Sequence, residues 1–494
     1  MDGGFLHMPF YQEWVAMTDA ITITAEPEPI LSSGFKGDTI RPQDSGFDAA
    51  RAVYSRSVDR RPALILCPTG AADVIDAVNY ARETNLPLAV RCGGHSVAGT
   101  SVCEGGVLID LSSLKGVHVD PGRGTAIAQG GTLWGEYDRE TQLFGLATPG
   151  GRVTTTGLGG FTLGGGYGWL SPMFGLTCDN LVGADVVTAD GRLVHASESE
   201  NPDLLWGLRG AGANFGVVTA YELRLHKVGP IMLAGMLVIP NQDTADIVRG
   251  YREYVERAPD GLVTALATLL APPEEFVPPE LVGKPVLGML AGYVGDLDEG
   301  QEAFGPLREL MAGGMDLTQP MPYTAFQAMI DGFAPKGWLN YHRGLHLREL
   351  SDEVIDPYLE VGRSIHSPMT QGIIFRHGGA VSRVDENATA AGNRDATYMA
   401  HPIACWDTSD QTDYEMDWVR RFSAAFAPAK TGGTYLNFEP GTTIGDVKAG
   451  FGAEKYERLV ELKDEWDPTN LFRSNHNVAP TGWQQPPLPQ QRGG

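Results

Sequence analysis

The stretch "RCGGHSVAG", Arg91–Gly99, places a single histidine among small residues. Three glycines, one alanine and one serine lie within five positions of His95. A histidine that packs in a core has bulky neighbours, whereas glycines leave the main chain open to close approach. The stretch therefore predicts that His95 meets a ligand that comes close to the backbone.

The residues around this loop predict alternating strands and helices. "PALILC" is a short apolar run, and the helical pattern that follows it places Val74, Val78 and Ala81 on one face. "LPLAV" predicts a second strand that runs straight into the His95 loop. From there to about Leu225 we expect mostly β-structure, with a hairpin turn at "ADGRL" and a short helix at "TLWGEYDRETQ".

A second glycine cluster, "TTTGLGGFTLGGGYGWL", spans Thr154 to Leu170 and contains seven glycines. Alone it fits a tight turn region, but this density also lets backbone N–H groups surround a phosphate. Two clusters, one of them with a histidine, favour a nucleotide site. Neither cluster supplies the G-x-G-x-x-G fingerprint that opens a helix, and the chain has no G-x-x-x-x-G-K-[ST] loop. We therefore expect neither a Rossmann-type dinucleotide site nor an ATPase.

Two groups of residues raise the question of a metal. Cys92, His95 and Cys103 match the spacing of no common zinc module and lack a fourth ligand. "HRGLH" places His342 and His346 four residues apart, without the glutamate that follows the first histidine in zinc proteases. We expect no metal site, which disfavours a zinc hydrolase.

Composition narrows the class of protein. A chain of 494 residues with 42% hydrophobic and 20% charged residues predicts a globular protein of two domains. Its 61 acidic and 37 basic residues give a net charge of −24, which repels nucleic acid and anionic membranes. No apolar run has the length of a membrane span, and the N-terminus lacks the order of a signal peptide. Together with an odd count of five cysteines, this predicts a cytoplasmic protein without a disulfide framework.

The pattern changes near Val228-Gly229-Pro230. "IMLAGMLVIP" and "PVLGMLAGYVG" predict strands, with a helix at "TADIVRGYREYVERA" and a Pro-rich loop at "PPEEFVPPELVGKP" between them. This section ends near Gly433. The stretch "AEKYERLVELKDEWDPTNLF" predicts a helix that ends at Asp-Pro and has Leu459, Leu462 and Trp466 on one side. Residues 484–494 are rich in Pro, Gln and Gly, a composition typical of disorder.

Several motifs in one order together resemble a known family. They are "RCGGHSVAG", "GGVLIDLSSLKGVHVD", "GGGYGWLSPMFGLTCDNLVGADVVTADGRLV", "DLLWGLRGAGANFGVVT" and "DPTNLFRSNHNVAP". They resemble the FAD-linked oxidases of the berberine-bridge-enzyme and 6-hydroxy-D-nicotine-oxidase type, in the vanillyl-alcohol-oxidase fold class. The resemblance runs from about Pro62 to Pro480.

The resemblance implies an α+β, two-domain flavoprotein of the PCMH type. Residues 1–228 and 434–494 would form the FAD-binding domain, the second segment ending in the disordered tail from about 484. Residues 229–433 would form the substrate domain, an antiparallel sheet flanked by helices. The active site would lie between the two domains.

The resemblance also implies the cofactor and its attachment. In this family the histidine of R-x-G-G-H is bonded through a ring nitrogen to the 8α-methyl group of FAD, and His95 is the match. Many relatives add a cysteinyl link, but Val153 stands at that position, so we expect no second bond. The residues implied to bind FAD are Arg91, Gly93, Gly94, His95, Ser96, Gly99, Gly150, Val153, Gly157, Gly160, Gly164, Val218, Tyr435, Asn437 and Asn477.

The sequence departs from the family at three further places. The histidine that follows the second pair of glycines in relatives is Phe161 here, and "TYLNF" has Phe438 where a second tyrosine is common. The frequent "YWK" is "YHR", residues 341–343. The last two changes leave open which residue acts as the catalytic base and which substrate is bound.

Hydride transfer needs a substrate C–H held against flavin N5 and a base for the neighbouring O–H or N–H proton. Tyr435 is the first candidate for the base or for orienting the substrate, and Tyr341, His342 and His401 are weaker candidates. Thr156 stands where the family places the side chain that controls a small oxygen pocket, and its short side chain favours reaction with O2.

The expected function is an oxidase that removes two electrons from an alcohol, amine or phenolic natural product and reduces O2 to H2O2. An oligosaccharide oxidase, a flavin dehydrogenase with another acceptor and a non-catalytic flavin-binding protein remain alternatives. The partners expected are a small-molecule substrate and O2, without nucleic acid or membrane. A monomer and a homodimer are both open.

Overall fold

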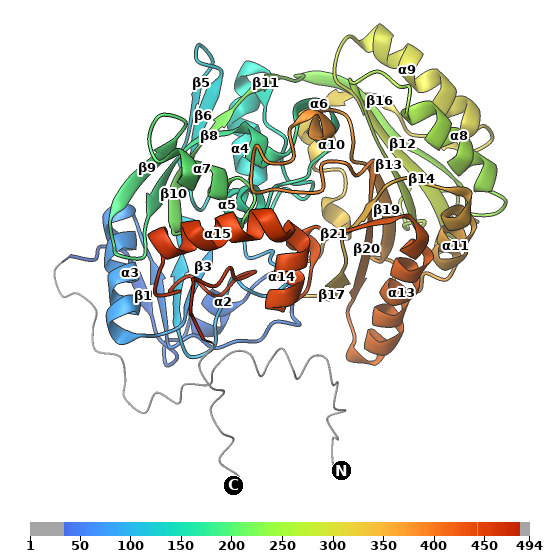
Figure 1. The fold of residues 1–494 in the computed structure, drawn as a ribbon. Coiled ribbons are helices and arrows are strands. Elements are labelled where there is room, and N and C mark those ends of the chain that lie inside the picture. Colours follow the sequence, from blue (N-terminus) through green and yellow to red (C-terminus); the bar gives the residue numbers. More distant parts are fainter. Residues whose placement is uncertain (1–33, 442, 485–494) are drawn as a thin grey trace, which may run out of the picture.

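The computed structural model describes residues 34–441 and 443–484, which form two lobes side by side (Figure 1). The first lobe begins with a four-stranded sheet in the order β1 (Asp38–Ile40), β2 (Leu64–Cys67), β4 (Val107–Asp110) and β3 (Leu88–Arg91). Strands β2, β4 and β3 are parallel. Helix α3 (Ala71–Thr84) buries Val74, Val78 and Ala81 completely, which confirms the predicted helical face.

The second sheet of this lobe is antiparallel. Its order is β5 (Val117–Asp120), β6 (Thr125–Gln129), β10 (Val217–Arg224), β8 (Leu181–Val187) and β9 (Leu193–Ser197). The hairpin predicted at "ADGRL" joins β8 to β9, and Gly191 takes a φ of 81° in its turn. A two-stranded pair, β7 (Leu146–Ala147) with β11 (His226–Lys227), completes the β-structure here.

The first lobe contains more helix than the sequence suggested. The predicted short helix is α4 (Trp134–Thr141), but α5 (Leu158–Leu163), α6 (Ser171–Phe174) and α7 (Pro202–Leu208) also lie in the region expected to be mostly β. Helix α5 falls inside the second glycine cluster, between Gly157 and Gly164. Short helices surrounded by glycines carry little apolar periodicity, which explains why the sequence pattern missed them.

The second lobe is built on one antiparallel sheet of ten strands, in the order β15-β12-β14-β13-β19-β20-β18-β21, with β16 beside β12 and β17 beside β20. Their bounds are β12 (Ile231–Pro240), β13 (Leu262–Leu270), β14 (Pro285–Tyr293), β15 (Met315–Asp316), β16 (Gln319–Pro322), β17 (Leu339–His342), β18 (Leu345–Leu347), β19 (Gln371–Arg376), β20 (Tyr398–Trp406) and β21 (Lys430–Thr434). Strands β12 and β14 and the loop between β13 and β14 match the prediction.

Helices cover one face of this sheet, and the other face meets the first lobe. The covering helices are α8 (Ala245–Val255), α9 (Leu297–Leu310), α11 (Asp352–Arg363) and α13 (Thr412–Ala425), as Figure 1 shows. Along β20, Tyr398, Ala400 and Ala404 belong to the core under the helices. Met399 and Ile403 pack into the other core, which also contains Tyr167 and Trp169 of the first lobe. The site-facing side of the sheet therefore lies between the lobes.

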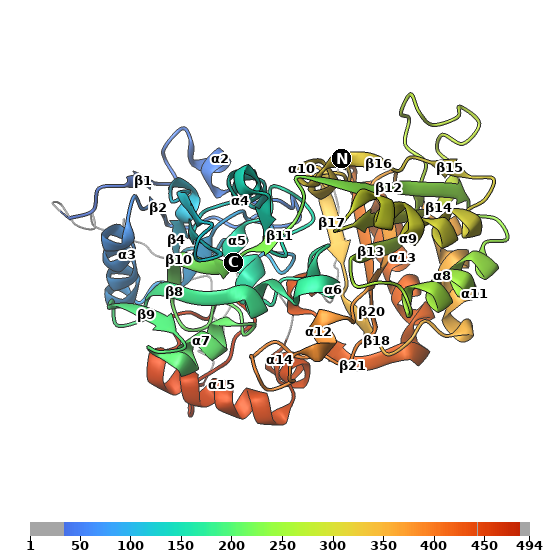
Figure 2. The same cartoon turned by 90° about the horizontal axis from the view of Figure 1, so that it is seen from above.

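The chain then returns to the first lobe. After β21, helices α14 (Ile444–Phe451) and α15 (Ala453–Trp466) lie along that lobe (Figure 2). Leu459 and Leu462 of α15 pack against Leu204 and Leu208 of α7 within one core. Helix α15 ends at Trp466, before Asp-Pro, as predicted. The remaining helices are α2 (Phe47–Arg51), α10 (Tyr323–Gln327) and α12 (Ala380–Arg383).

The sequence also made predictions about disulfides, membrane spans and the two ends of the chain. All five cysteines are free. No helix within 34–441 and 443–484 is both long and apolar enough to span a bilayer. The predictions about the extreme N-terminus and about disorder after residue 484 fall outside the described residues.

Candidate functional site

The loop after β3 holds His95 half-buried beside polar and aromatic neighbours. Its Nε2 lies 2.9 Å from Oγ1 of Thr155, and its ring stacks on Tyr54 with centroids 4.2 Å apart. Burial, with a smaller contribution from the Lys336 charge, lowers the pKa of His95 to about 4. The ring is therefore neutral at pH 7 and keeps a nitrogen lone pair.

The two glycine clusters are in direct contact. A Cβ added to Gly93 would lie 2.3 Å from the amide nitrogen of Gly157, and one added to Gly157 would lie 2.3 Å from that of Gly93. Side chains at these two positions would separate the loops. These glycines are thus explained first by close packing of backbone on backbone, which holds Thr155 next to His95.

The C-terminal motif closes on the second cluster. A Cβ on Gly164 would lie 2.0 Å from Oδ1 of Asn437. The Tyr435 hydroxyl accepts hydrogen bonds from the backbone N–H of Tyr167 at 2.9 Å and from Nδ2 of Asn437 at 3.1 Å. With both acceptor positions used, the O–H proton of Tyr435 is left to be donated. Burial raises the pKa of Tyr435, so the phenol is protonated at neutral pH.

Strand alternation separates the sheet residues that were candidates for catalysis. His342 on β17 and His401 on β20 face the first lobe, and their ring centroids are 5.4 Å apart. Tyr341 packs with the core under the helices, on the opposite face of the sheet, where its hydroxyl accepts from Arg343. Because successive residues of a strand point to opposite faces, this placement speaks against a role for Tyr341 in the site.

The site-facing histidines are neutral and have no hydrogen-bond partners among the described residues. Both ring nitrogens of His342 and of His401 are buried there without a hydrogen bond. Burial, with the charge of His95, lowers the pKa of His342 to about 3. Burial lowers the pKa of His401 well below its usual value, with smaller contributions from the charges of His342 and Arg152. Phe438, the residue that replaces the second tyrosine of relatives, stacks on His401 with centroids 3.6 Å apart.

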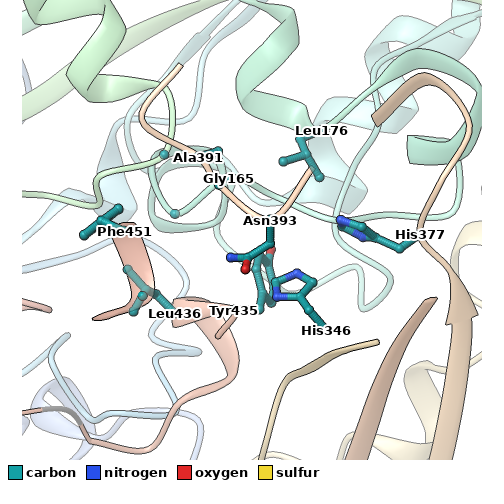
Figure 3. A pocket seen from close by; sticks show the side chains of 13 residues that line it. Gly165, Leu176, His346, His377, Ala391, Asn393, Tyr435, Leu436 and Phe451 are labelled. Atoms are coloured by element: carbon teal, nitrogen blue, oxygen red, sulfur yellow. The ribbon is translucent and has the colours of Figure 1, made fainter. Parts of the chain in front are cut away.

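A small hollow of about 30 Å³, partly open to solvent, lies next to Tyr435 (Figure 3). His346, His377 and Asn393 line it together with Tyr435. Burial lowers the pKa of His346 to about 4. In Figure 3 the rings of Tyr435 and His346 lie close together, and Phe451 of α14 borders the opposite side.

Arg152 is a buried cation that the sequence reading missed. Its guanidinium carbon lies 3.6 Å from the ring centroid of Phe375. It is also 5.6 Å from the centroids of Trp169 and Phe438. The signal was present in the sequence, because an arginine inside "PGGRVTTTG" is the one charge in a run of small residues.

Other predicted cofactor residues have structural partners. Arg91 forms a buried ion pair with Asp110 at 2.6 Å, which joins β3 to β4. The Ser96 hydroxyl accepts from the backbone N–H of Thr100 and shapes the turn that contains Gly99. Val218 is buried in β10.

The remaining predicted positions vary in their surroundings. A Cβ on Gly150 would meet the Trp134 ring at 2.6 Å, whereas Gly160 is exposed with nothing within 4 Å. Gly94 has a φ of 72°. The Oδ1 of Asn477 is buried and accepts no hydrogen bond from residues 34–441 or 443–484. Val153 and Thr156 are half-buried, and the Thr156 amide donates to the Val153 carbonyl at 3.0 Å.

Comparison with known proteins agrees with this geometry. The protein-family model of the FAD binding domain matches residues 62–197. A second family model, described as berberine and berberine like, matches residues 434–479. An FAD-linked oxidoreductase of Dictyostelium discoideum is 30% identical over 447 residues, covering 88% of this chain and 94% of the relative. The chain is an FAD-linked oxidoreductase of the berberine-bridge-enzyme type.

Two further relatives define how far the likeness extends. (R)-6-hydroxynicotine oxidase of Paenarthrobacter nicotinovorans is 29% identical over 460 residues, covering 90% of this chain and 97% of the relative. The crystal structure of 6-hydroxy-D-nicotine oxidase from Arthrobacter nicotinovorans superposes with a TM-score of 0.82 at 28% identity, covering 91% and 99% of the two chains. A xylooligosaccharide oxidase from Myceliophthora thermophila shares the fold, with a TM-score of 0.79 at 23% identity and coverage of 90% and 98%.

The residues of this FAD-linked oxidoreductase fit its cofactor. His95 is neutral and half-buried, stacks on Tyr54 on one face, and lies on a glycine-containing loop whose backbone a ligand can approach closely, which suits a ring that bonds a ligand carbon. Among the described residues, His342 and His401 on the sheet and Arg152 in the first lobe carry buried nitrogen atoms without a hydrogen-bond partner. His401 and Arg152 both lie against Phe438. Such atoms in a native fold call for a bound group to satisfy them.

Proposed function

We propose that this FAD-linked oxidoreductase is an oxidase. It takes two electrons from an alcohol, amine or phenolic natural-product substrate and passes them to O2, giving H2O2. The observation that carries the proposal is the pair of neutral histidines on the sheet, His342 and His401. Their ring nitrogens have no hydrogen-bond partner among the described residues, and they face the loops that would hold FAD. A substrate between these two surfaces would meet polar atoms on one side and the cofactor on the other.

We propose that FAD is attached through His95 alone. The neutral ring supplies the nitrogen, and the contact with Thr155 fixes its orientation. A glucooligosaccharide oxidase from Acremonium strictum, which shares the fold, is described with a 6-S-cysteinyl, 8α-N1-histidyl FAD. Here Val153 cannot form the cysteinyl bond, because its side chain has no thiol. Bound FAD would supply the two-electron acceptor atom, N5.

Tyr435 would orient the substrate as a hydrogen-bond donor, since its oxygen already accepts two hydrogen bonds. The protonated phenol makes it a poor resting base. His342 and His401 are the candidates to take the proton, because their ring nitrogens have no hydrogen-bond partner among the described residues. Their lowered pKa values make them weak bases before substrate is bound. This division keeps three of the four candidates from the sequence and selects, for Tyr435, the orienting role from the two that the sequence left open.

The proposed domains follow the lobes. Residues up to 228 and from 434 would bind FAD, and residues 229–433 would bind substrate. Strand β21 crosses the second boundary, because it ends at Thr434. The cytoplasmic location and the choice between monomer and homodimer stay predictions.

The test is a panel of alcohols, amines, phenols and oligosaccharides mixed anaerobically with the enzyme. Bleaching of the flavin absorbance identifies substrates, and H2O2 is then measured after oxygen is admitted. Stoichiometric H2O2 supports the oxidase. Bleaching without rapid reoxidation would establish a dehydrogenase instead, and bleaching by oligosaccharides alone would establish a carbohydrate oxidase.

A further inference from the structure

Arg152 differs from the other buried arginines of the chain. Arg91 is paired with Asp110 at 2.6 Å, and Arg394 is paired with Asp179 at 2.7 Å. Arg152 is 8% exposed, its Nη1 has no hydrogen-bond partner, and it forms no ion pair in the part of the chain that the structure describes. A buried charge of this kind is costly unless an anion pairs with it.

The rings around Arg152 do not replace such a partner. Phe375 lies in cation–π distance, and Tyr167, Trp169 and Phe438 complete an aromatic enclosure. Cation–π attraction compensates only part of the hydration that a guanidinium loses on burial. Burial lowers the pKa of Arg152 to about 10, so the group still carries its charge at neutral pH. His401 and His342 nearby are neutral and offer no counter-charge.

We propose that Arg152 binds an anionic group of the substrate, a carboxylate or phenolate carried on a planar ring. The guanidinium presents a planar fork of N–H donors that matches a carboxylate with two parallel hydrogen bonds. The enclosing aromatic side chains suit a flat ring. The same enclosure contains Phe438, which touches both His401 and Tyr435. The anion would therefore hold the substrate beside the donor and the proton acceptors.

This inference rests on the proposed function, because it assigns the chemical class of that site's substrate. It can be tested without turnover. Benzoate and benzamide share one ring and one shape, but only benzoate is an anion. Their affinities for the FAD-loaded enzyme can be measured by calorimetry and by the perturbation of the flavin absorbance.

The wild-type enzyme should bind benzoate about 10- to 100-fold more tightly than benzamide, as expected for a charge-assisted hydrogen-bonded pair. Arg152→Met keeps the length of the side chain without its charge and should remove the preference. Arg152→Lys should retain part of it, since the charge remains but the fork is lost. Arg363→Met, at an exposed position on α11, is the matched control and should bind like the wild type.

Equal affinities for the two ligands in the wild type would overturn the inference without any variant. A preference that survives Arg152→Met would overturn it too, and a variant with full FAD content and a normal melting curve makes that result decisive. If Arg152→Met does not fold, Arg152→Gln provides the same comparison. A benzoate preference without oxidation of any substrate would refute the oxidase alone, whereas H2O2 production without the preference would refute the anion site alone.

Discussion

Replacement of Tyr435 by phenylalanine removes one oxygen atom from the centre of the site. That oxygen accepts the backbone N–H of Tyr167 at 2.9 Å and Nδ2 of Asn437 at 3.1 Å. Asn437 also donates to the carbonyl of Phe161 at 3.2 Å, so it keeps one partner in the variant. The Tyr167 amide has no such alternative among the hydrogen bonds of the described residues and would be left buried and unsatisfied.

The magnitude follows from these contacts. A buried donor without a partner costs about 1–3 kcal/mol, so Tyr435→Phe should lower the free energy of unfolding by about 2 kcal/mol. The variant also lacks the O–H that would orient the substrate. Loss of one preorganised donor should slow anaerobic reduction of the flavin by about 10²-fold, with a smaller effect on substrate affinity.

Stopped-flow absorbance measures the reduction step, and thermal unfolding measures stability. Tyr398→Phe is the matched control, because the buried Tyr398 hydroxyl has no hydrogen-bond partner in the described part of the chain and its ring lies in the core under the helices. That control should reduce at the wild-type rate and be no less stable. If Tyr435→Phe behaves like Tyr398→Phe in both assays, Tyr435 is an ordinary core residue and our reading of the site fails.

Three further predictions concern single positions. His95→Ala should give a colourless acid-precipitated pellet, whereas the wild-type pellet should stay yellow and its peptide map should carry the flavin on the His95 peptide; flavin on any other peptide contradicts a single link. Thr156→Leu should slow reoxidation of the reduced enzyme by O2 and leave anaerobic reduction nearly unchanged, because the longer side chain would fill an oxygen pocket that threonine leaves partly open; equal reoxidation rates would place the oxygen path elsewhere. Burial raises the pKa of Asp138 to about 8 from 3.8, so the folded state holds a proton that the unfolded chain has lost, and stability should fall as the pH rises between these values by about 1.4 kcal/mol per unit. Asp138→Asn should remove this loss of stability. If the melting temperatures of the wild type and of Asp138→Asn change equally between pH 5 and pH 8, this prediction is refuted.

Much of the architecture could be predicted because strong periodicity survives in one sequence. The faces of α3 and α15 and the hairpin at Gly191 follow from side-chain spacing and turn chemistry. Strand β13 was not predicted from the sequence, because it is buried on both faces and its residues show no alternation of apolar and polar side chains. The motifs located His95, but only the fold shows that Thr155 is its hydrogen-bond partner.

The site residues were harder to predict for a different reason. Tyr341 and His342 are neighbours in sequence, yet the pleat of β17 places only His342 at the site. Arg152 has no ion-pair partner because no carboxylate of the described residues lies next to it in the fold. A local sequence pattern cannot predict that absence. Such properties arise from long-range packing between two lobes.

The return of the chain after β21 has a consequence for how the protein is made. Asn437 meets Gly164, and α15 meets α7, so contacts separated by more than 200 residues complete the first lobe. During synthesis these partners leave the ribosome only after the whole ten-stranded sheet has been translated. The early lobe must therefore wait, incomplete, while the insertion between its two parts emerges. If attachment of the flavin needs both parts of the first lobe, it would occur only after the last helix has docked. The yellow colour of the bound flavin would then mark molecules in which the first lobe is complete.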